Sequence, residues 1–126
     1  MKKLGLSLIA LLTFATQNAF SKEIILTKSS SLQEIINSNE NVVVDFFATW
    51  CGPCKQFAPI FKKEADANAN IVFVKVDADQ HSALATQHGA TSLPTIVFFK
   101  GGKKAALVKG YKNPAEFKKL LATHLK

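Results

Sequence analysis

The hydrophobic positions fall into short runs separated by turn residues, and this pattern predicts alternating strands and helices. Three runs are rich in Val, Ile and Phe without alternating polar positions, as is typical of strands covered on both faces. A brief apolar run precedes these three. After the last of them, Gly101-Gly102 predicts a hairpin turn that leads into one more strand. The five strands are expected at residues 23–27, 41–48, 71–77, 95–100 and 104–109.

Helical spacing of apolar residues occurs between and after these strands. The longest helix is expected after Cys51, where Phe57, Ile60 and Phe61 have i, i+3, i+4 spacing and Pro59 predicts a kink. Two helix starts have a capping signature: Ser31 with Glu34, and Asn113 with Pro114 and Glu116. The four helices are expected at residues 32–38, 51–68, 82–88 (ended by Gly89) and 113–126.

The predicted order β-α-β-α-β-α-β-β-α indicates an α/β fold. Three strand–helix alternations followed by a hairpin predict one central mixed β-sheet with helices on both faces. Residues 22–126 contain no internal repeat or linker, so a single domain is expected over this range.

Residues 1–21 have the features of a cleaved signal peptide. A basic start, Met1-Lys2-Lys3, precedes an uncharged apolar run, and small residues at Ala19 and Ser21 predict cleavage after Ser21. The alternative is a membrane anchor, but the apolar run from Leu4 to Ala15 is shorter than the roughly 20 residues that span a bilayer. We therefore expect a periplasmic location, or secretion from the cell.

The charge is basic overall and unevenly distributed. The chain has a formal net charge of +7, and all sixteen basic residues are lysine. Residues 22–79 have six Lys and eight acidic residues (−2), whereas residues 80–126 have eight Lys and one acidic residue (+7). Nucleic acid is not an expected partner, because arginine is absent and no aromatic residues interleave the lysines. The basic half serves solubility or attracts an acidic partner or an anionic membrane surface.

Cys51 and Cys54 are the chain's two cysteines, and they lie where a buried strand gives way to a helix. A cysteine at a helix N-terminus ionises more easily, so Cys51 is the expected nucleophile and Cys54, one turn later and more buried, the expected resolving thiol. Gly52 allows close approach of a partner's backbone, and Pro53 favours a helix start. One alternative is a structural disulfide, but a ring this small restricts the unfolded chain very little and would stabilise the fold poorly. The other alternative is half of a metal site.

The histidines offer little to a metal site, because His81 and His88 lack the usual ligand spacing. His81, His88 and His124 are expected to be ordinary surface or half-buried residues. Asp45 is different, because it lies within the most apolar strand, where burial raises a carboxyl pKa. It is expected to take the proton from Cys54, although a solvent-facing carboxylate or a pair with Lys75 is the alternative.

Several separated motifs show that residues 22–126 resemble the thioredoxin family. "WCGPCK" at 50–55 matches that family's active site, and "LPT" at 93–95 stands where the family has a cis-proline beside its disulfide. Further matches are Asp45, Lys75, Pro59, "FFKGG" at 98–102 and Gly110. The resemblance implies a thioredoxin fold, a cis peptide bond at Pro94, and a substrate groove. The groove is formed by Trp50, Gly52, Pro53, Leu93, Pro94 and Thr95, with Lys75 and Gly110 in support.

The resemblance also implies an activity. A protein of this kind reduces protein disulfides through its own dithiol, here Cys51 and Cys54, with no other cofactor and no metal, and it is expected to be a monomer. Phe47 and Leu93 differ from common family residues but remain apolar. Since an exported member lacks the cytosolic NADPH-dependent reductase, we expect a membrane-bound electron donor. An oxidase or isomerase of disulfides, or a non-catalytic binding subunit, remains the alternative.

Overall fold

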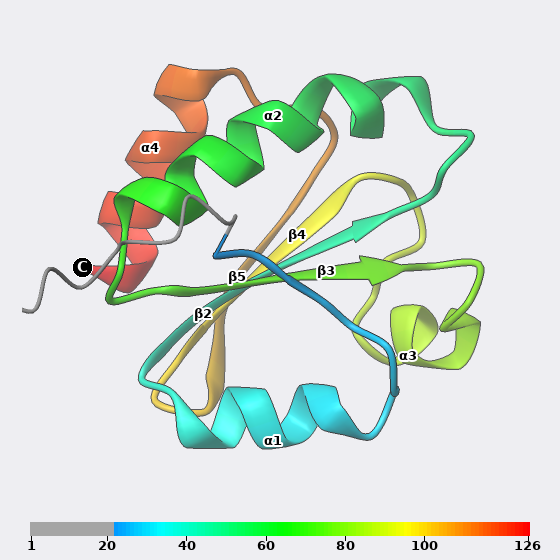
Figure 1. Ribbon diagram of the computed structural model, residues 1–126, viewed down its shortest axis with the longest axis horizontal. Coiled ribbons are helices and arrows are strands. Elements are labelled where there is room, and N and C mark those ends of the chain that lie inside the picture. The colour runs from blue at the N-terminus through cyan, green and yellow to red at the C-terminus, as the bar shows by residue number, and fades with distance from the viewer. Residues whose placement is uncertain (1–21) are drawn as a thin grey trace, which may run out of the picture.

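A computed structural model describes residues 22–126, so the expected signal peptide at residues 1–21 lies outside the described residues. Within 22–126, five strands form one mixed sheet in the order β1-β3-β2-β4-β5. Figure 1 shows α2 and α4 on one face of this sheet and α1 and α3 on the other. The elements are β1 (Ile24–Ile25), α1 (Ser31–Ser38), β2 (Asn41–Phe47), α2 (Gly52–Ala67), β3 (Val72–Asp77), α3 (Ser82–Gln87), β4 (Thr95–Lys100), β5 (Lys103–Lys109) and α4 (Pro114–Leu125).

This arrangement confirms the predicted order of elements and the predicted fold class. The largest difference in length is at β1, which has two residues because only that part of residues 23–27 pairs with β3. None of the helices in residues 22–126 has the length and apolar character needed to cross a membrane.

The central strand β2 determines where the functional residues lie. It runs parallel to β3 and antiparallel to β4, and residues 42–46 are all buried, as its unbroken apolar run predicts. The β4–β5 hairpin turns at Gly101 and Gly102, whose φ angles of +58° and +81° are easily reached by glycine. The carboxyl ends of β2 and β3, the start of β4 and the end of β5 therefore lie at one edge of the sheet.

An aromatic cluster holds α2 and α4 against the sheet. Phe57 and Phe61 of α2 and Phe117 of α4 have no exposed surface, and their rings meet edge to face or stacked, with centroids 5.0 Å apart for Phe57 and Phe117 and 5.9 Å for Phe61 and Phe117. Phe61 also meets Phe73 of β3 at 5.2 Å. Such aromatic pairs stabilise beyond the burial of their area, so they fix the axis of α2 and thereby the position of its first turn.

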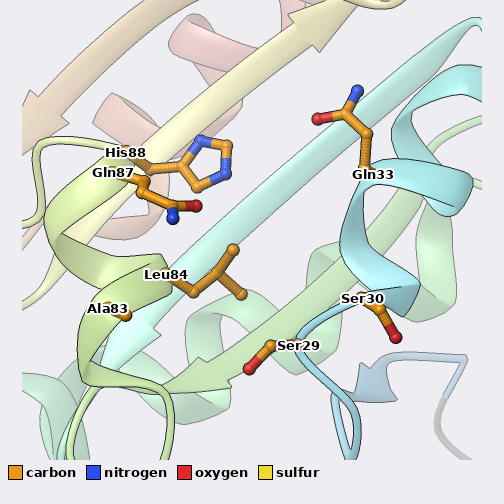
Figure 2. A pocket seen from close by; sticks show the side chains of 7 residues that line it. All are labelled: Ser29, Ser30, Gln33, Ala83, Leu84, Gln87 and His88. Carbon is orange, nitrogen blue, oxygen red and sulfur yellow. The ribbon is translucent and has the colours of Figure 1, made fainter.

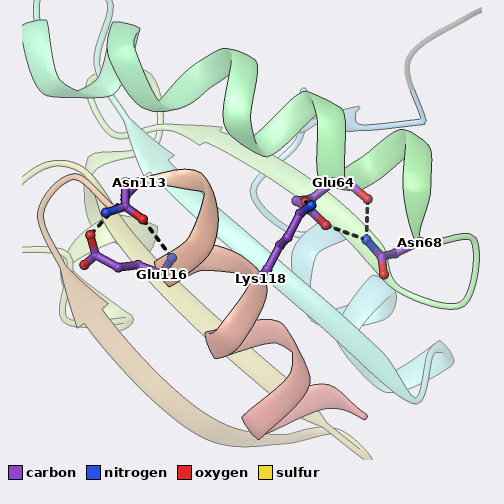
Figure 3. A network of polar contacts seen from close by, with 5 residues as sticks. All are labelled: Glu64, Asn68, Asn113, Glu116 and Lys118. Carbon is purple, nitrogen blue, oxygen red and sulfur yellow. Dashed lines mark hydrogen bonds and ion pairs between the residues drawn. The ribbon is translucent and has the colours of Figure 1, made fainter.

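A buried carboxylate also joins α2 to α4. Glu64 is 6% exposed, accepts a hydrogen bond from Asn68 Nδ2 at 2.9 Å, and lies 3.8 Å from Lys118 Nζ of α4 (Figure 3). Both contacts compensate the cost of burying the charge.

The capping box expected at Ser31 and the N-cap expected at Asn113 have different outcomes. In α4 the box is formed: Asn113 Oδ1 accepts from the Glu116 amide at 2.8 Å, and Glu116 accepts from the Asn113 amide (Figure 3). In α1 the prediction is wrong, because the helix begins at Ser31 and its N-cap, Ser30, makes no side-chain cap. Ser30 already has helical φ and ψ of −64° and −22°, since the preceding turn leads directly into the helix.

These caps give a matched test of stability. Asn113→Ala is expected to lower the free energy of unfolding by about 1 kcal/mol, because the Glu116 amide loses its acceptor. Ser31→Ala is the control, and it should leave stability unchanged or slightly raised, because Ser31 caps nothing and alanine favours a helix. Urea unfolding measures both variants, and an equal loss for the two would contradict the assignment of the caps.

Candidate active site

The cysteine pair lies at the junction between β2 and α2. Cys51 is the N-cap of α2, with extended φ and ψ of −82° and 112°, and Cys54 lies in the first turn of the helix. The two are joined by a disulfide, with Cα atoms 5.2 Å apart. The backbone amide of Cys54 donates to Cys51 Sγ at 3.2 Å, so this sulfur occupies the position where a helix N-terminus stabilises negative charge.

Burial differs only slightly between the two cysteines. Cys54 is the more buried residue, as predicted, but by a small margin: Cys51 and Cys54 are 5% and 3% exposed. The disulfide holds both against Ala48, and Leu93 packs on the same group. The difference between the two cysteines is therefore electrostatic: Cys51 Sγ is the acceptor of a helix amide.

The peptide bond between Leu93 and Pro94 is cis, as the resemblance implies, and Leu93 packs against the two cysteines. The Pro94 carbonyl accepts from the Gly110 amide at 2.8 Å, which ties this turn to the end of β5. Thr95 is placed differently from the prediction. It has no exposed surface and its hydroxyl donates to the Ser92 carbonyl, so it supports the turn from inside instead of lining a groove.

The residues before and between the cysteines form the exposed rim of the site. Trp50 is 69% exposed, while Gly52 and Pro53 are exposed at the start of α2. A Cβ atom built at Gly52 would meet no atom within 4 Å, so the protein itself does not require glycine there. The space above Gly52 is open to an approaching chain.

Asp79 is a site residue that the sequence analysis missed. Its Oδ2 accepts from Trp50 Nε1 at 2.8 Å and holds the indole beside the cysteines. The chain reaches this position because Asp77, at the end of β3, accepts the Asp79 amide in a tight turn. An Asp-x-Asp sequence after a parallel strand was the available signal, since that strand ends at the same sheet edge as β2.

Asp45 is buried in β2, as predicted. It is 1% exposed, and neither carboxylate oxygen has a hydrogen-bond partner within the described part of the chain. Burial raises the pKa of Asp45 to about 7; Lys75 opposes this shift and Glu23 adds to it. The carboxyl can therefore exchange a proton near neutral pH.

Lys75 does not neutralise Asp45 by direct contact. The two are partners across β2 and β3, but the Lys75 ammonium lies 4.4 Å from the centroid of the Phe47 ring, and no ion pair joins it to Asp45 among residues 22–126. Cys54 and Lys75 line one cavity of about 220 Å³. Water in this cavity would reach both the second cysteine and the lysine.

A second hollow of about 300 Å³ lies on the other face of the sheet, between α1 and α3. Figure 2 shows the residues that line it: Ser29, Ser30, Gln33, Ala83, Leu84, Gln87 and His88. His88 is half-buried against the rings of Phe46 and Phe99, and burial, with help from Lys104, lowers its pKa.

The other two histidines have structural contacts. His81 Nδ1 lies 2.7 Å from Ser29 Oγ, and the ring of His124 packs on Phe98. In the part of the chain that the structure describes, no three His, Cys, Asp or Glu residues are grouped so that they could hold a metal ion.

Comparisons with known proteins agree with this geometry. The thioredoxin family model matches residues 22–123. A thioredoxin from Mycoplasmoides gallisepticum is 41% identical over 96 residues, which are 76% of this chain and 96% of that protein. Thioredoxin-2 from Saccharomyces cerevisiae is 43% identical over 91 residues, covering 72% of this chain and 86% of its own.

Solved structures give the same result. The crystal structure of a thioredoxin from Nicotiana alata superposes with a TM-score of 0.78 at 35% identity, covering 84% of this chain and 95% of that one. A thioredoxin from Plasmodium falciparum gives a TM-score of 0.75 at 37% identity, covering 80% and 98%. This chain thus belongs to the thioredoxin family and is a disulfide oxidoreductase with the Cys51–Cys54 pair in its active-site region.

Proposed function

We propose that this protein is an exported thioredoxin, which reduces disulfides of proteins outside the cytoplasm. The basic and apolar pattern of residues 1–21 supports the proposal, and the family match begins at Lys22, directly after the expected cleavage site. A membrane-bound donor outside the cytosol then returns two electrons to the Cys51–Cys54 disulfide. Disulfide-bearing proteins are its partners.

The position of Cys51 Sγ at the α2 N-terminus is the observation on which the mechanism rests. In the reduced protein, the Cys51 thiolate attacks one sulfur of a substrate disulfide, forms a mixed disulfide, and releases the other substrate sulfur as a thiolate, which takes a proton from solvent. The Cys54 thiolate then attacks Cys51 Sγ and releases the second substrate thiolate. Two electrons pass from the dithiol to the substrate, and the Cys51–Cys54 disulfide remains.

Asp45 has the role of accepting the Cys54 proton before the second attack. Its pKa of about 7 makes the carboxylate a usable base near neutral pH, whereas an ordinary aspartate would bind the proton too weakly. The cavity that Cys54 and Lys75 line gives water access to the Cys54 end of this transfer. Trp50, Gly52, Pro53, Leu93 and Pro94 form the surface on which the substrate chain lies.

Cys54→Ser tests the order of attack. This variant should accumulate mixed disulfides between Cys51 and envelope proteins, because the resolving thiol is absent, and these should be visible as high-mass bands on non-reducing gels. Cys51→Ser is the matched control and should trap nothing. Full insulin reduction by Cys51→Ser would contradict the mechanism, and full biological function of the double serine variant would favour a non-catalytic binding subunit.

The pKa of Asp45 predicts how stability depends on pH. Between pH about 4 and 7 the folded protein keeps a proton that the unfolded chain releases, so stability should fall as pH rises, by about 4 kcal/mol in total. Asp45→Asn should remove this slope and be the more stable protein above pH 7. Glu34→Gln, on the exposed surface of α1, is the control and should retain it. Urea unfolding across this range provides the measurement.

The same Asp45→Asn variant tests the proton-transfer role. Release of substrate from the mixed disulfide should slow by about tenfold or more at pH 7, because Cys54 loses its base. The deficit should shrink at higher pH, where Cys54 ionises without help. A purely structural role would slow the reaction equally at every pH, and stopped-flow Trp50 fluorescence distinguishes the two outcomes.

Export has its own test. When the full chain is expressed in a bacterial host, the protein should be released with the periplasmic fraction and its N-terminal sequence should begin at Lys22. A Leu8→Arg/Leu11→Arg variant interrupts the apolar run and should keep the uncleaved chain in the cell. Recovery of the unaltered protein in the cytoplasm with residues 1–21 intact would rule out export.

A further inference from the structure

The segment between β5 and α4 forms one side of the disulfide site. Lys109 pairs with Thr95 across the β4–β5 hairpin, and the next amide, that of Gly110, donates to Pro94 O at 2.8 Å. Leu93, which precedes Pro94, packs against the cysteines. A substrate chain that lies on the cis-proline turn therefore passes beside residues 109–112.

Two lysines hold positive charge at this place. Lys109 Nζ donates to Thr91 Oγ1 at 2.7 Å, and Lys112 Nζ donates to the Lys109 carbonyl at 3.0 Å. Both acceptors are neutral, and within residues 22–126 no carboxylate comes within ion-pair distance of either ammonium group. Tyr111, 40% exposed, lies between them in sequence. We call residues Lys109, Tyr111 and Lys112 the basic corner.

The opposite side of the site has carboxylates and lysines together, because Lys55 and Lys75 line the cavity beside Cys54. Asp77 ends β3, and Asp79 holds Trp50. Because β3 and β4 lie on opposite sides of β2, which leads to Cys51, the acidic side chains and the basic corner flank the disulfide from two directions. On the β3 side positive and negative groups therefore balance, whereas within residues 22–126 the positive charge of the basic corner has no carboxylate at ion-pair distance.

We infer that this thioredoxin prefers protein disulfides with acidic residues next to the cysteine that lies on the cis-proline turn, and that Lys109 and Lys112 determine this preference. The inference rests on the proposed reductase function and defines its substrate class. Acidic side chains would meet unneutralised ammonium groups there, while lysines would be repelled. The net charge of +7 in residues 80–126 adds long-range attraction for the same substrates.

Two synthetic peptides test the preference. Each has one internal disulfide and the same length, with glutamates beside the cysteines in one and lysines in the other. The wild-type protein should reduce the glutamate peptide with a kcat/KM about fivefold higher at low ionic strength, as expected for two exposed charge pairs. The ratio should approach one near 1 M salt, where the Debye length is about 3 Å.

In Lys109→Gln/Lys112→Gln, the ratio of the two kcat/KM values should fall to between about one and about two, because the local charges are gone. Lys100→Gln/Lys103→Gln is the matched control. It removes the same total charge at the far end of the hairpin, about 20 Å along β5, and should retain the wild-type ratio. If the variant acted only by breaking the Lys109–Thr91 contact, it would slow the reduction of both peptides equally and leave the ratio of their kcat/KM values unchanged. An unchanged ratio in Lys109→Gln/Lys112→Gln would therefore overturn the inference.

Other outcomes have distinct meanings. If the wild-type protein reduces insulin, and reduces the two peptides at the same rate as each other, the inference is wrong while the reductase function stands. If it reduces neither insulin nor peptides, the proposed function itself fails. The wild-type protein could instead reduce both peptides at equal rates and sediment with vesicles of phosphatidylglycerol and phosphatidylcholine. If both double variants lose this sedimentation, the four lysines bind a membrane surface and the inference is overturned.

Discussion

The hydrogen bond from the Cys54 amide to Cys51 Sγ is the interaction on which the active site depends, and much of the fold serves to hold it. The sulfur is fixed by β2, which is hydrogen-bonded on both sides and buried along its length. The amide is fixed by α2, which the rings of Phe57 and Phe61 anchor to the sheet and to α4. Because both elements are packed in the core, the helix amide and dipole already face the first cysteine, where they stabilise negative charge.

The same rigid centre explains why Asp45 has an altered pKa. A carboxyl group in the middle of a central strand loses its hydration, and a nearby lysine could have compensated this loss by forming an ion pair. Lys75 instead extends over the Phe47 ring, so its attraction reduces the effect of burial without cancelling it. The protein thereby keeps in its core a carboxyl group whose pKa lies at about 7.

The sequence predicts those parts that depend on local pattern. The unbroken apolar run of β2, the Gly101-Gly102 turn and the Asn113 cap each contain their structural cause within a few residues, and all were confirmed. The predictions that were wrong or missing concern the direction in which a side chain points and the residue that it contacts. Whether Ser31 caps a helix depends on the turn before it, and whether Thr95 faces solvent depends on the sheet. The Trp50–Asp79 contact joins loops 29 residues apart, so the Asp-x-Asp sequence after β3 indicates it only once the order of the strands in the sheet is known.

Topology also converts the order of charges along the chain into polarity in space. Because the strand order is β1-β3-β2-β4-β5, the acidic first half of the domain forms one side of the sheet and the lysine-rich second half forms the other. The central strand β2 leads directly to Cys51, so the disulfide lies at the boundary between the two halves. A substrate chain crossing that boundary has one flank near Asp79 and the other near Lys109. Under the inferred substrate preference, attraction to Lys109 would favour one orientation of that chain before any sulfur reacts.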